Sequence, residues 1–348
     1  MASDEKRRKW VITGGAGFIG CHAASRLHEQ GHHVVLVDNL SRRGAEANLA
    51  WLQGQGITDF IKADVRDAQA MRDAVGRHAD ADCVLHLAAQ VAVTTSVKDP
   101  REDFEINALG TFNVLEAVRA AGAGPAVLYS STNKVYGNLE HVQVVERDGR
   151  YAYEDLPRGV DENEPLDFHS PYGCSKGAGD QYVRDYARIY GLKTVVFRQS
   201  CIYGTRQFGI EDQGWIAWFC VAATGGRPFT IFGDGKQIRD TLWVGDLVDA
   251  YQAAVARIDS VSGEIFNVGG GPGNTLSLLE LVATLDAAFG KKFNPPLADW
   301  RPGDQRVFVA DIGKAKRLLD WSPKVSTADG VARLLEWVRE NHHLFGTW

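Results

Sequence analysis

The segment KWVITGGAGFIGCHAASRLHEQG, residues 9–31, decides the fold of this chain. It opens with an apolar run that is typical of a buried strand. It then passes through a glycine-rich turn and continues as an amphipathic helix that ends at Gly31. A strand that leads through such a turn directly into a helix is the beginning of a βαβ unit. The segment therefore predicts an α/β protein.

The same alternation continues through the first 200 residues. Helix-length segments, such as 101–122 and 173–190, separate further strand-like runs: HHVVLVDN, FIKADV, CVLHLAA, PAVLYSST and KTVVFRQS. Strands spaced by helices indicate right-handed crossovers and a parallel sheet. Because the runs are almost continuously apolar, both faces of the sheet are expected to be covered. We predict a doubly wound parallel Rossmann sheet.

After about residue 200 the alternation weakens, and the turn signals GDGK, GGGPGN and RPGD separate shorter elements. This change predicts a smaller mixed α/β C-terminal lobe. The strand-then-helix segment 239–257 is expected to return to the main sheet. We therefore predict a Rossmann domain over 1–198 and about 238–262, and a substrate lobe over about 199–237 and 263–348. Segment 138–169 has few helix or strand signals and is expected to form a lid or rim.

Composition excludes several classes of protein. The 348 residues are 45% hydrophobic and 24% charged, as in ordinary globular enzymes. A net charge of −6 does not favour nucleic-acid binding. No apolar run has the length of a membrane span, and the polar start differs from a signal peptide. The five cysteines lack the spacing of a disulfide framework or a metal site. We expect a cytoplasmic protein that binds no metal, membrane or nucleic acid.

The glycines of the first turn predict a phosphate-binding loop. Gly14, Gly17 and Gly20 have the spacing G-x-x-G-x-x-G between a strand and a helix. Glycine permits a tight turn and close approach of backbone N–H groups to a pyrophosphate, and the helix N-terminus adds a positive dipole end. The sequence therefore predicts a bound dinucleotide, although a plain βα turn is the simpler alternative.

Asp38, at the end of the second strand, indicates which dinucleotide is bound. It lies 18 residues after Gly20, where a carboxylate accepts hydrogen bonds from the ribose of NAD and repels the 2′-phosphate of NADP. Arg42 and Arg43 argue for NADP, but Asp38 favours NAD. Asp64 and Val65 end the third strand and are expected to meet the adenine. For Asp64 a helix N-cap is the alternative.

Two later motifs carry candidate reacting groups. The fifth strand ends in the hydroxyl residues Ser130, Ser131 and Thr132, at the sheet edge where doubly wound folds bind ligands. Tyr172 precedes Lys176 by four residues, so the two share a helix face. Sequence spacing alone does not separate a catalytic pair from a surface pair.

Taken together, the motifs TGGAGFIG, HLAAQ, SST, YGCSK and RPGD closely resemble the extended short-chain dehydrogenase/reductase family of nucleotide-sugar epimerases and dehydratases. The resemblance covers essentially the whole chain. It implies that Thr132, Tyr172 and Lys176 are the catalytic residues, with Tyr172 as general base and Thr132 orienting the reacting oxygen. Lys176 and the positive nicotinamide ring are expected to lower the pKa of Tyr172.

The resemblance also implies the binding residues. Contacts to NAD are expected from Gly14, Gly17, Phe18, Ile19, Gly20, Asp38, Asn39, Ser41, Arg42, Asp64, Val65, Leu87, Ala88, Gln90, Tyr172 and Lys176. Contacts to the nucleotide sugar are expected from Thr94, Asn133, Gln199, Arg239 and Arg301. Guanidinium groups match phosphate oxygens, so the two arginines are candidates for the substrate diphosphate, with structural ion pairs as the alternative.

Two residues bear on which family member this is. Dehydratases of the family carry an Asp-Glu pair directly after the strand-end threonine, whereas this chain has Asn133 and Lys134. Longer stretches, such as SSTNKVYG and RQFGIEDQGW, resemble members that invert C2 of a CDP-linked sugar. A UDP-hexose 4-epimerase, a related UDP-sugar decarboxylase and a non-catalytic NAD-binding sensor are the alternatives. Asn133 is a candidate for contact with the sugar, whereas a solvated position at the strand end is an equal alternative for Lys134.

The two long helical segments also predict an assembly. In this family the helices corresponding to 101–122 and 173–190 pair with their copies in a partner. A homodimer or homotetramer is therefore expected.

Overall fold

A computed structural model describes residues 7–122, 124–301 and 303–346. Its centre is a seven-stranded parallel sheet with the order β12-β8-β5-β4-β1-β2-β3. The strands are β1 (Lys9–Thr13), β2 (His33–Asp38), β3 (Phe60–Lys62), β4 (Cys83–His86), β5 (Ala126–Thr132), β8 (Thr194–Gln199) and β12 (Glu264–Val268). The order runs outward in both directions from β1, which confirms the predicted doubly wound Rossmann sheet.

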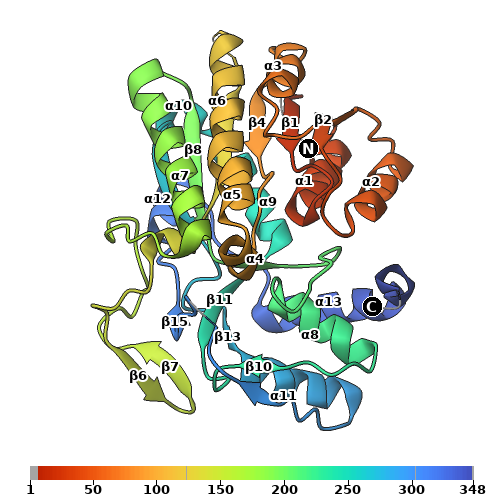
Figure 1. Cartoon of the computed structure of the whole chain (residues 1–348), viewed down its shortest axis with the longest axis vertical. Helices are drawn as coiled ribbons and strands as arrows, with labels where there is room; N and C mark the ends of the chain where they lie inside the picture. Colours follow the sequence, from red (N-terminus) through yellow and green to blue (C-terminus); the bar gives the residue numbers. More distant parts are fainter. Residues whose placement is uncertain (1–6, 123, 302, 347–348) are drawn as a thin grey trace.

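Helices cover both faces of this sheet (Figure 1). On one face lie α1 (Phe18–Glu29), α2 (Ala45–Gly54), α9 (Val244–Ala256) and α12 (Gly313–Leu319). On the other lie α3 (Ala68–Gly76), α6 (Gly110–Ala120) and α7 (Ser170–Tyr190). Successive strand residues point to opposite faces, so Trp10 and Ile12 enter the first core and Val11 the second. This explains the continuous apolar runs in the sequence.

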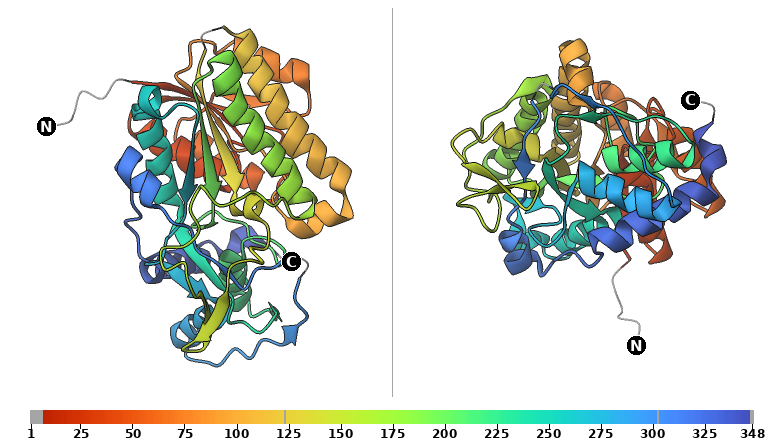
Figure 2. Two further views of the ribbon diagram at one scale, coloured as in Figure 1. Left: turned by 90° about the vertical axis from the view of Figure 1, so that its left-hand side faces the viewer. Right: turned by 90° about the horizontal axis from the view of Figure 1, so that it is seen from below.

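The smaller lobe lies beyond the carboxyl ends of the central strands (Figures 1 and 2). Its sheets contain β9 (Cys201–Tyr203), β10 (Ile231–Phe232), β11 (Ile238–Trp243), β13 (Thr275–Ser277), β14 (Leu297–Ala298) and β15 (Val307–Phe308). Packed on them are α8 (Trp215–Thr224), α11 (Leu278–Phe289) and α13 (Thr327–Glu340), with a separate apolar core. The predicted C-terminal lobe is thus present.

One strand expectation is wrong. The strand at the start of segment 239–257 does not return to the main sheet, because β11 pairs with β9, β13 and β15 in the lobe. Its helix, α9, nevertheless packs on the central sheet. The strand that completes the sheet is β12, which pairs with β8. The exact domain boundaries stay a prediction.

The segment 138–169 is less irregular than expected. It contains the antiparallel hairpin of β6 (Val144–Arg147) and β7 (Arg150–Tyr153), which projects beside the lobe (Figure 2). Tyr151 Oη donates to Asp234 at 2.6 Å, so the hairpin is fastened to the turn after β10. A lid or rim role for this segment stays a prediction.

The predicted helical segment 101–122 consists of three consecutive pieces. These are α5 (Pro100–Phe104), a π-helical turn η1 (Glu105–Leu109) and α6. α4 (Val93–Lys98) precedes them, and η2 (Asn133–Tyr136) follows β5. The remaining short elements are α10 (Ile258–Val261) and η3 (His342–Phe345). Within the described part of the chain, no helix is both long and apolar enough to cross a membrane.

Candidate active site

The glycine-rich turn between β1 and α1 has the shape of a phosphate loop. Gly14 has a φ of +71°, and a Cβ there would lie 2.7 Å from the backbone nitrogen of Ala88. A Cβ on Gly20 would lie 2.1 Å from the carbonyl oxygen of Gly14. Glycine is therefore required at both positions, by conformation at the first and by close helix packing at the second. α1 begins at Phe18, directly beyond Gly17, with Ile19 in its first turn.

Asp38 lies beside this turn at the end of β2. Its carboxylate accepts hydrogen bonds from the backbone N–H groups of Ala16 at 3.0 Å and Leu40 at 2.7 Å. Burial raises its pKa from the ordinary value, although these N–H groups oppose the rise. The carboxylate thus braces the loop and retains acceptor capacity for ribose hydroxyls. The residues present therefore fit a dinucleotide of the NAD type, with Gly14, Gly20 and Asp38 as its cradle.

Asp64 and Asn39 extend this cradle. Asn39 Nδ2 donates to Asp64 at 2.9 Å, and the backbone N–H of Ser41 donates to Asn39 at 3.0 Å. The side chain of Arg66 binds Asp64 and, as the largest cause, lowers its pKa to about 2. The N-cap of α3 is Asp67, so the alternative that Asp64 caps that helix is wrong.

The remaining predicted cofactor residues lie around the end of β4. Leu87 and Ala88 are half-buried behind the glycine turn, whereas Val65, after β3, is buried against Gly110 at the start of α6. Gln90 Nε2 donates to Asp103 and to the carbonyl oxygen of Ala92, both at 2.8 Å. The side chain of Gln90 is thus occupied in fixing the loop after β4, a role that the sequence motif does not reveal.

Thr132 and Tyr172 are brought together by β5 and α7. Thr132 and Tyr172 are 6% and 8% exposed and line the same cleft, where the Thr132 side chain acts to lower the pKa of Tyr172. The backbone N–H of Tyr172 donates to Ser96 Oγ at 3.1 Å, which fixes the first turn of α7 against α4. The pair therefore forms one polar group at the carboxyl end of β5, where the sequence places it.

The expected lowering of the pKa of Tyr172 by Lys176 is not found. Burial raises that pKa to about 12, and the effects that oppose the rise come from the Thr132 side chain and the charge of Arg42. Lys176 Nζ instead donates to the carbonyl oxygen of Ser130 at 2.5 Å and lies 4.3 Å from the ring centre of Tyr129. Burial lowers the pKa of Lys176 to about 7. Desolvation outweighs the attraction between opposite charges here.

A cleft of about 310 Å³ lies between the central sheet and the lobe, beside Thr132 and Tyr172. Thr132, Tyr172 and four of the five predicted substrate residues line it, namely Thr94, Asn133, Arg239 and Arg301. The fifth, Gln199, is not among the residues that line the cleft, because its Nε2 donates to Tyr251 Oη at 2.5 Å inside the core. The hydroxyl of Thr94 is buried in the wall without a hydrogen-bond partner, among the described residues.

Both arginines of the cleft have acidic partners. Arg239 lies 3.0 Å from Asp304. Arg301 lies 3.1 Å from Asp212, and its guanidinium stacks 3.7 Å above the ring of Phe232. The ion pairs that the sequence analysis left as the alternative are therefore present. An aromatic ring and two guanidinium groups among the residues that line the cleft suit a nucleoside diphosphate.

Two features of the cleft were missed or left open by sequence reasoning. Segment 211–215 forms part of its wall, and Gln213 accepts a hydrogen bond from Arg42, in the loop after β2, at 3.3 Å. Only the motif RQFGIEDQGW marked that segment. Lys134 also lines the cleft and is half-buried, and burial lowers its pKa to about 8. Lys134 is therefore not a solvated residue at the strand end.

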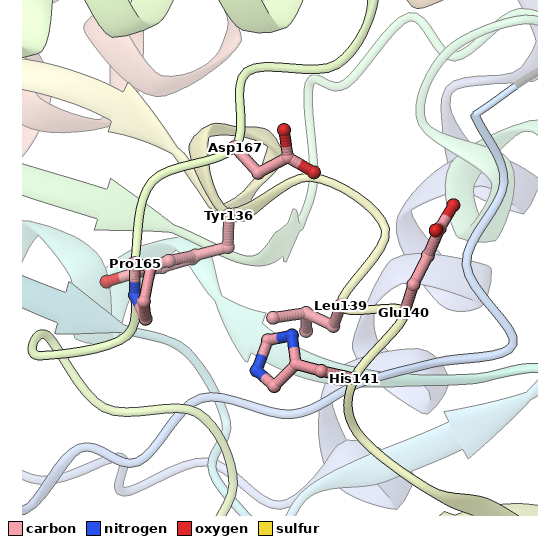
Figure 3. A pocket seen from close by; sticks show the side chains of 6 residues that line it. All are labelled: Tyr136, Leu139, Glu140, His141, Pro165 and Asp167. Atoms are coloured by element: carbon pink, nitrogen blue, oxygen red, sulfur yellow. The ribbon is translucent and has the colours of Figure 1, made fainter.

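A second hollow, of about 310 Å³, lies in the insertion that follows η2 (Figure 3). It is lined by Tyr136, Leu139, Glu140, His141, Pro165 and Asp167. None of these is a predicted site residue. His141 pairs with Glu164 at 2.7 Å, which joins the segment before β6 to the segment after β7. Within the described residues, no group of three or more His, Cys, Asp and Glu side chains is placed to hold a metal ion.

Comparison with known proteins agrees with this geometry. Residues 10–269 match the model of the NAD dependent epimerase/dehydratase family. The chain is 48% identical to a CDP-paratose 2-epimerase of Salmonella typhi, over 94% of this chain and 98% of that protein. It is 36% identical to a UDP-glucose 4-epimerase of Mycolicibacterium smegmatis, over 94% of this chain and 98% of that protein.

Solved structures show the same fold. A UDP-glucose 4-epimerase of Thermotoga maritima, determined with UDP-glucose, superposes with a TM-score of 0.83 at 33% identity, covering 96% of this chain and 99% of that one. A dTDP-glucose 4,6-dehydratase of Streptomyces venezuelae with NAD bound gives a TM-score of 0.83 at 29% identity, covering 97% of this chain and 99% of that one.

Proposed function

The chain belongs to the NAD dependent epimerase/dehydratase family, and we propose that it epimerises CDP-paratose to CDP-tyvelose at C2 of the sugar. It is a sugar-nucleotide epimerase that uses bound NAD. The observation that carries the proposed substrate is the 48% identity to the Salmonella typhi enzyme over nearly the whole length of both chains. The absence of carboxylates at Asn133 and Lys134 distinguishes the chain from the dehydratases that share its fold.

The proposed chemistry assigns one task to each group of the cleft. Gly14, Gly20 and Asp38 would hold NAD, which would supply the hydride acceptor and donor that inversion at C2 requires. Tyr172 takes the proton of the C2 hydroxyl and later gives it back, while Thr132 orients the reacting oxygen. Since burial favours the protonated phenol, the charge of Arg42 assists proton removal by lowering the pKa of Tyr172. Arg239 and Arg301 hold the diphosphate, and Thr94 contacts the sugar.

The decisive experiment uses CDP-paratose that carries deuterium at C2. We expect the product to be inverted at C2, to retain its label and to leave no net reduced NAD. Inversion at C4 with the C2 label untouched would contradict the assigned carbon and leave the roles of Thr132 and Tyr172 intact. A protein that binds NAD but converts no nucleotide sugar would favour the sensor alternative.

A UDP-sugar enzyme is the second candidate. The 36% identity to the Mycolicibacterium smegmatis 4-epimerase and the superposition on the Thermotoga maritima enzyme support it. Parallel incubations with CDP-paratose, UDP-glucose and UDP-glucuronate, followed by sugar analysis, separate the two. The proposal requires the CDP-sugar to have the highest kcat/KM.

We also infer that the chain forms a homodimer, with a homotetramer as the alternative. Support comes from large apolar side chains that are exposed on α5, η1, α6 and α7: Phe104, Leu109, Phe112, Tyr182, Ile189 and Tyr190. Pairing of α6 and α7 with their copies would remove this surface from water. The expected location in the cytoplasm stays a prediction from the sequence.

A further inference from the structure

Lys134 connects the two sides of the cleft. It lies two residues after Thr132 at the end of β5, and its Nζ donates to the carbonyl oxygen of Gly303 at 3.0 Å. The same Nζ lies 3.4 Å from Oε1 of Gln305. Both acceptors follow Arg301 closely in the lobe. One side chain thus reaches from the strand that presents the reacting hydroxyl to the segment that carries a diphosphate-binding candidate.

Lys134 is half-buried, and groups of both charges act on its ammonium group. Burial is the main cause that lowers its pKa to about 8, Arg239 lowers it further, and Asp304 opposes them. Asp304 is also the partner of Arg239. Removing an ammonium group from water costs free energy unless hydrogen-bond acceptors surround it. Here Gly303 and Gln305 of the lobe supply those acceptors. The contact therefore holds that segment at a defined place relative to β5.

A second side chain fastens the same segment. Gln305 is 4% exposed, and its Nε2 donates to the carbonyl oxygen of Gly137, just beyond η2. Lys134 and Gln305 together attach segment 303–305 to segment 134–137. Lys134 is the member of this pair that also lines the cleft.

We propose that Lys134 is a positioning residue that sets the span between the reacting carbon and the anchored diphosphate. This inference rests on the proposed function. An epimerase must let the oxidised sugar turn over while the nucleotide remains bound, so that hydride returns to the other face. The turn brings the carbon back to the same point only if the anchor and the Thr132–Tyr172 pair keep their separation. Lys134 maintains that separation from outside the reacting group.

We call the contact of Lys134 with Gly303 and Gln305 the tether. Lys134→Met tests it, because methionine keeps most of the side-chain volume and removes the cation. We expect the variant to fold and to bind NAD normally. Its KM for the nucleotide sugar should rise at least about tenfold and its kcat should fall by up to about a hundredfold, as expected for a displaced reacting carbon. More of the enzyme should also keep its nicotinamide reduced after substrate is added, because the oxidised sugar leaves or turns incorrectly. Near-ultraviolet absorbance reports that fraction, and Lys134→Arg should restore it.

The matched control is Lys314→Met. Lys314 Nζ donates to the carbonyl oxygen of Ile265 and pairs with Glu264, both at 2.7 Å, away from the cleft. If Lys134→Met equals this control in KM, kcat and reduced fraction, the tether is refuted. If Lys134→Met does not fold, Gln305→Leu replaces it and must shift the same quantities in the same direction.

The outcomes for the tether and for the proposed substrate are separable. A wild-type enzyme that epimerises a UDP-sugar and not CDP-paratose overturns the substrate. The variants are then compared with that UDP-sugar, because the span argument applies to any nucleotide sugar that turns within the cleft. A wild-type protein that epimerises none overturns both proposals.

Discussion

The hydroxyl of Tyr172 is the group on which the proposed chemistry depends. Tyr172→Phe keeps the buried ring and removes the proton carrier. We expect folding and NAD binding to persist while turnover falls at least about a hundredfold, the usual contribution of a general acid–base group. Steady-state kinetics and calorimetric NAD titration measure the two effects.

Tyr186→Phe is the control for this change. Tyr186 lies on the same helix and is 4% exposed, and its hydroxyl donates to Glu116 at 2.7 Å. Loss of this hydroxyl should lower the free energy of unfolding slightly and leave turnover unchanged. Equal turnover in wild type and Tyr172→Phe would remove Tyr172 from the mechanism.

Asp240 gives a prediction for pH. It is fully buried on β11, accepts hydrogen bonds from Ser200 Oγ and from the backbone N–H of Gly271, and has a pKa raised to about 6 by burial. An unfolded aspartate titrates near about 3.9, so the folded state binds this proton more tightly. The contribution of Asp240 to the free energy of unfolding therefore increases as pH falls from about 7 to about 5, by about 1 kcal/mol.

Comparison with Asp240→Asn isolates this contribution, because asparagine has a similar shape and does not titrate. In urea unfolding at several pH values, the free energy of unfolding of the wild type should increase relative to that of the variant as the pH falls. A difference between the two proteins that stays constant with pH would show that Asp240 has an ordinary pKa.

Single residues show what the sequence can and cannot predict. Gly14, Thr132 and Tyr172 were predictable, because each sits at a fixed place in a local strand–turn–helix pattern. The orientation of Gln199 was not, since a strand pattern does not tell which buried partner a side chain meets. The effect of Arg42 on the pKa of Tyr172 was also missed. Arg42 lies 130 residues earlier in the sequence, and only folding brings its charge close enough to lower that pKa.

At the scale of elements, β5, β8 and α7 are joined by a buried ion pair. Arg198 on β8 binds Asp180 on α7 through two contacts of 3.0 Å, and Ser131 on β5 donates to the same carboxylate at 2.7 Å. The two charged side chains are 3% and 0% exposed. This network supports, from behind, the strand end that carries Thr132.

Arg198→Met should destabilise the protein strongly. It leaves the Asp180 carboxylate buried without its cation, and such a change costs about 3–5 kcal/mol. Lys193→Met is the control. Lys193 directly precedes β8 and pairs with Asp259 at the surface, where the two side chains are 55% and 83% exposed. That loss should be below about 1 kcal/mol. Equal denaturant midpoints for both variants would argue against a structural role for the buried pair.

The error over β11 has a physical cause at this scale. β11 and β12 are both short segments that mix apolar and polar residues, so their local sequence pattern does not distinguish them. Which strand completes the central sheet depends on how the chain crosses between domains, and that is set by non-local pairing with β8. The hairpin of β6 and β7 was missed because its charged, half-exposed residues show little hydrophobic alternation.

At the scale of the whole molecule, α6 and α7 lie side by side (Figure 1), and each exposes large apolar side chains to solvent. Phe112 on α6 and Tyr182 on α7 lie with ring centres 5.9 Å apart, and the two side chains belong to residues that are 37% and 49% exposed. Ile189 on α7 and Phe104 on α5 are also exposed, at 66% and 56%. An apolar face of this kind is typical of a subunit interface, because a monomer gains nothing by exposing it.

Phe112→Glu should therefore convert the expected dimer into a monomer. In a two-fold interface each substitution occurs twice. Two carboxylates would therefore be buried at the interface without partners, and this would cost several kcal/mol of dimerisation free energy. Light scattering at micromolar concentration measures the mass. Leu318→Glu on α12, where Leu318 is 41% exposed, is the control and should not change it. A wild-type protein that already scatters as a monomer at this concentration would refute the dimer, and the apolar face would then have to contact a different partner.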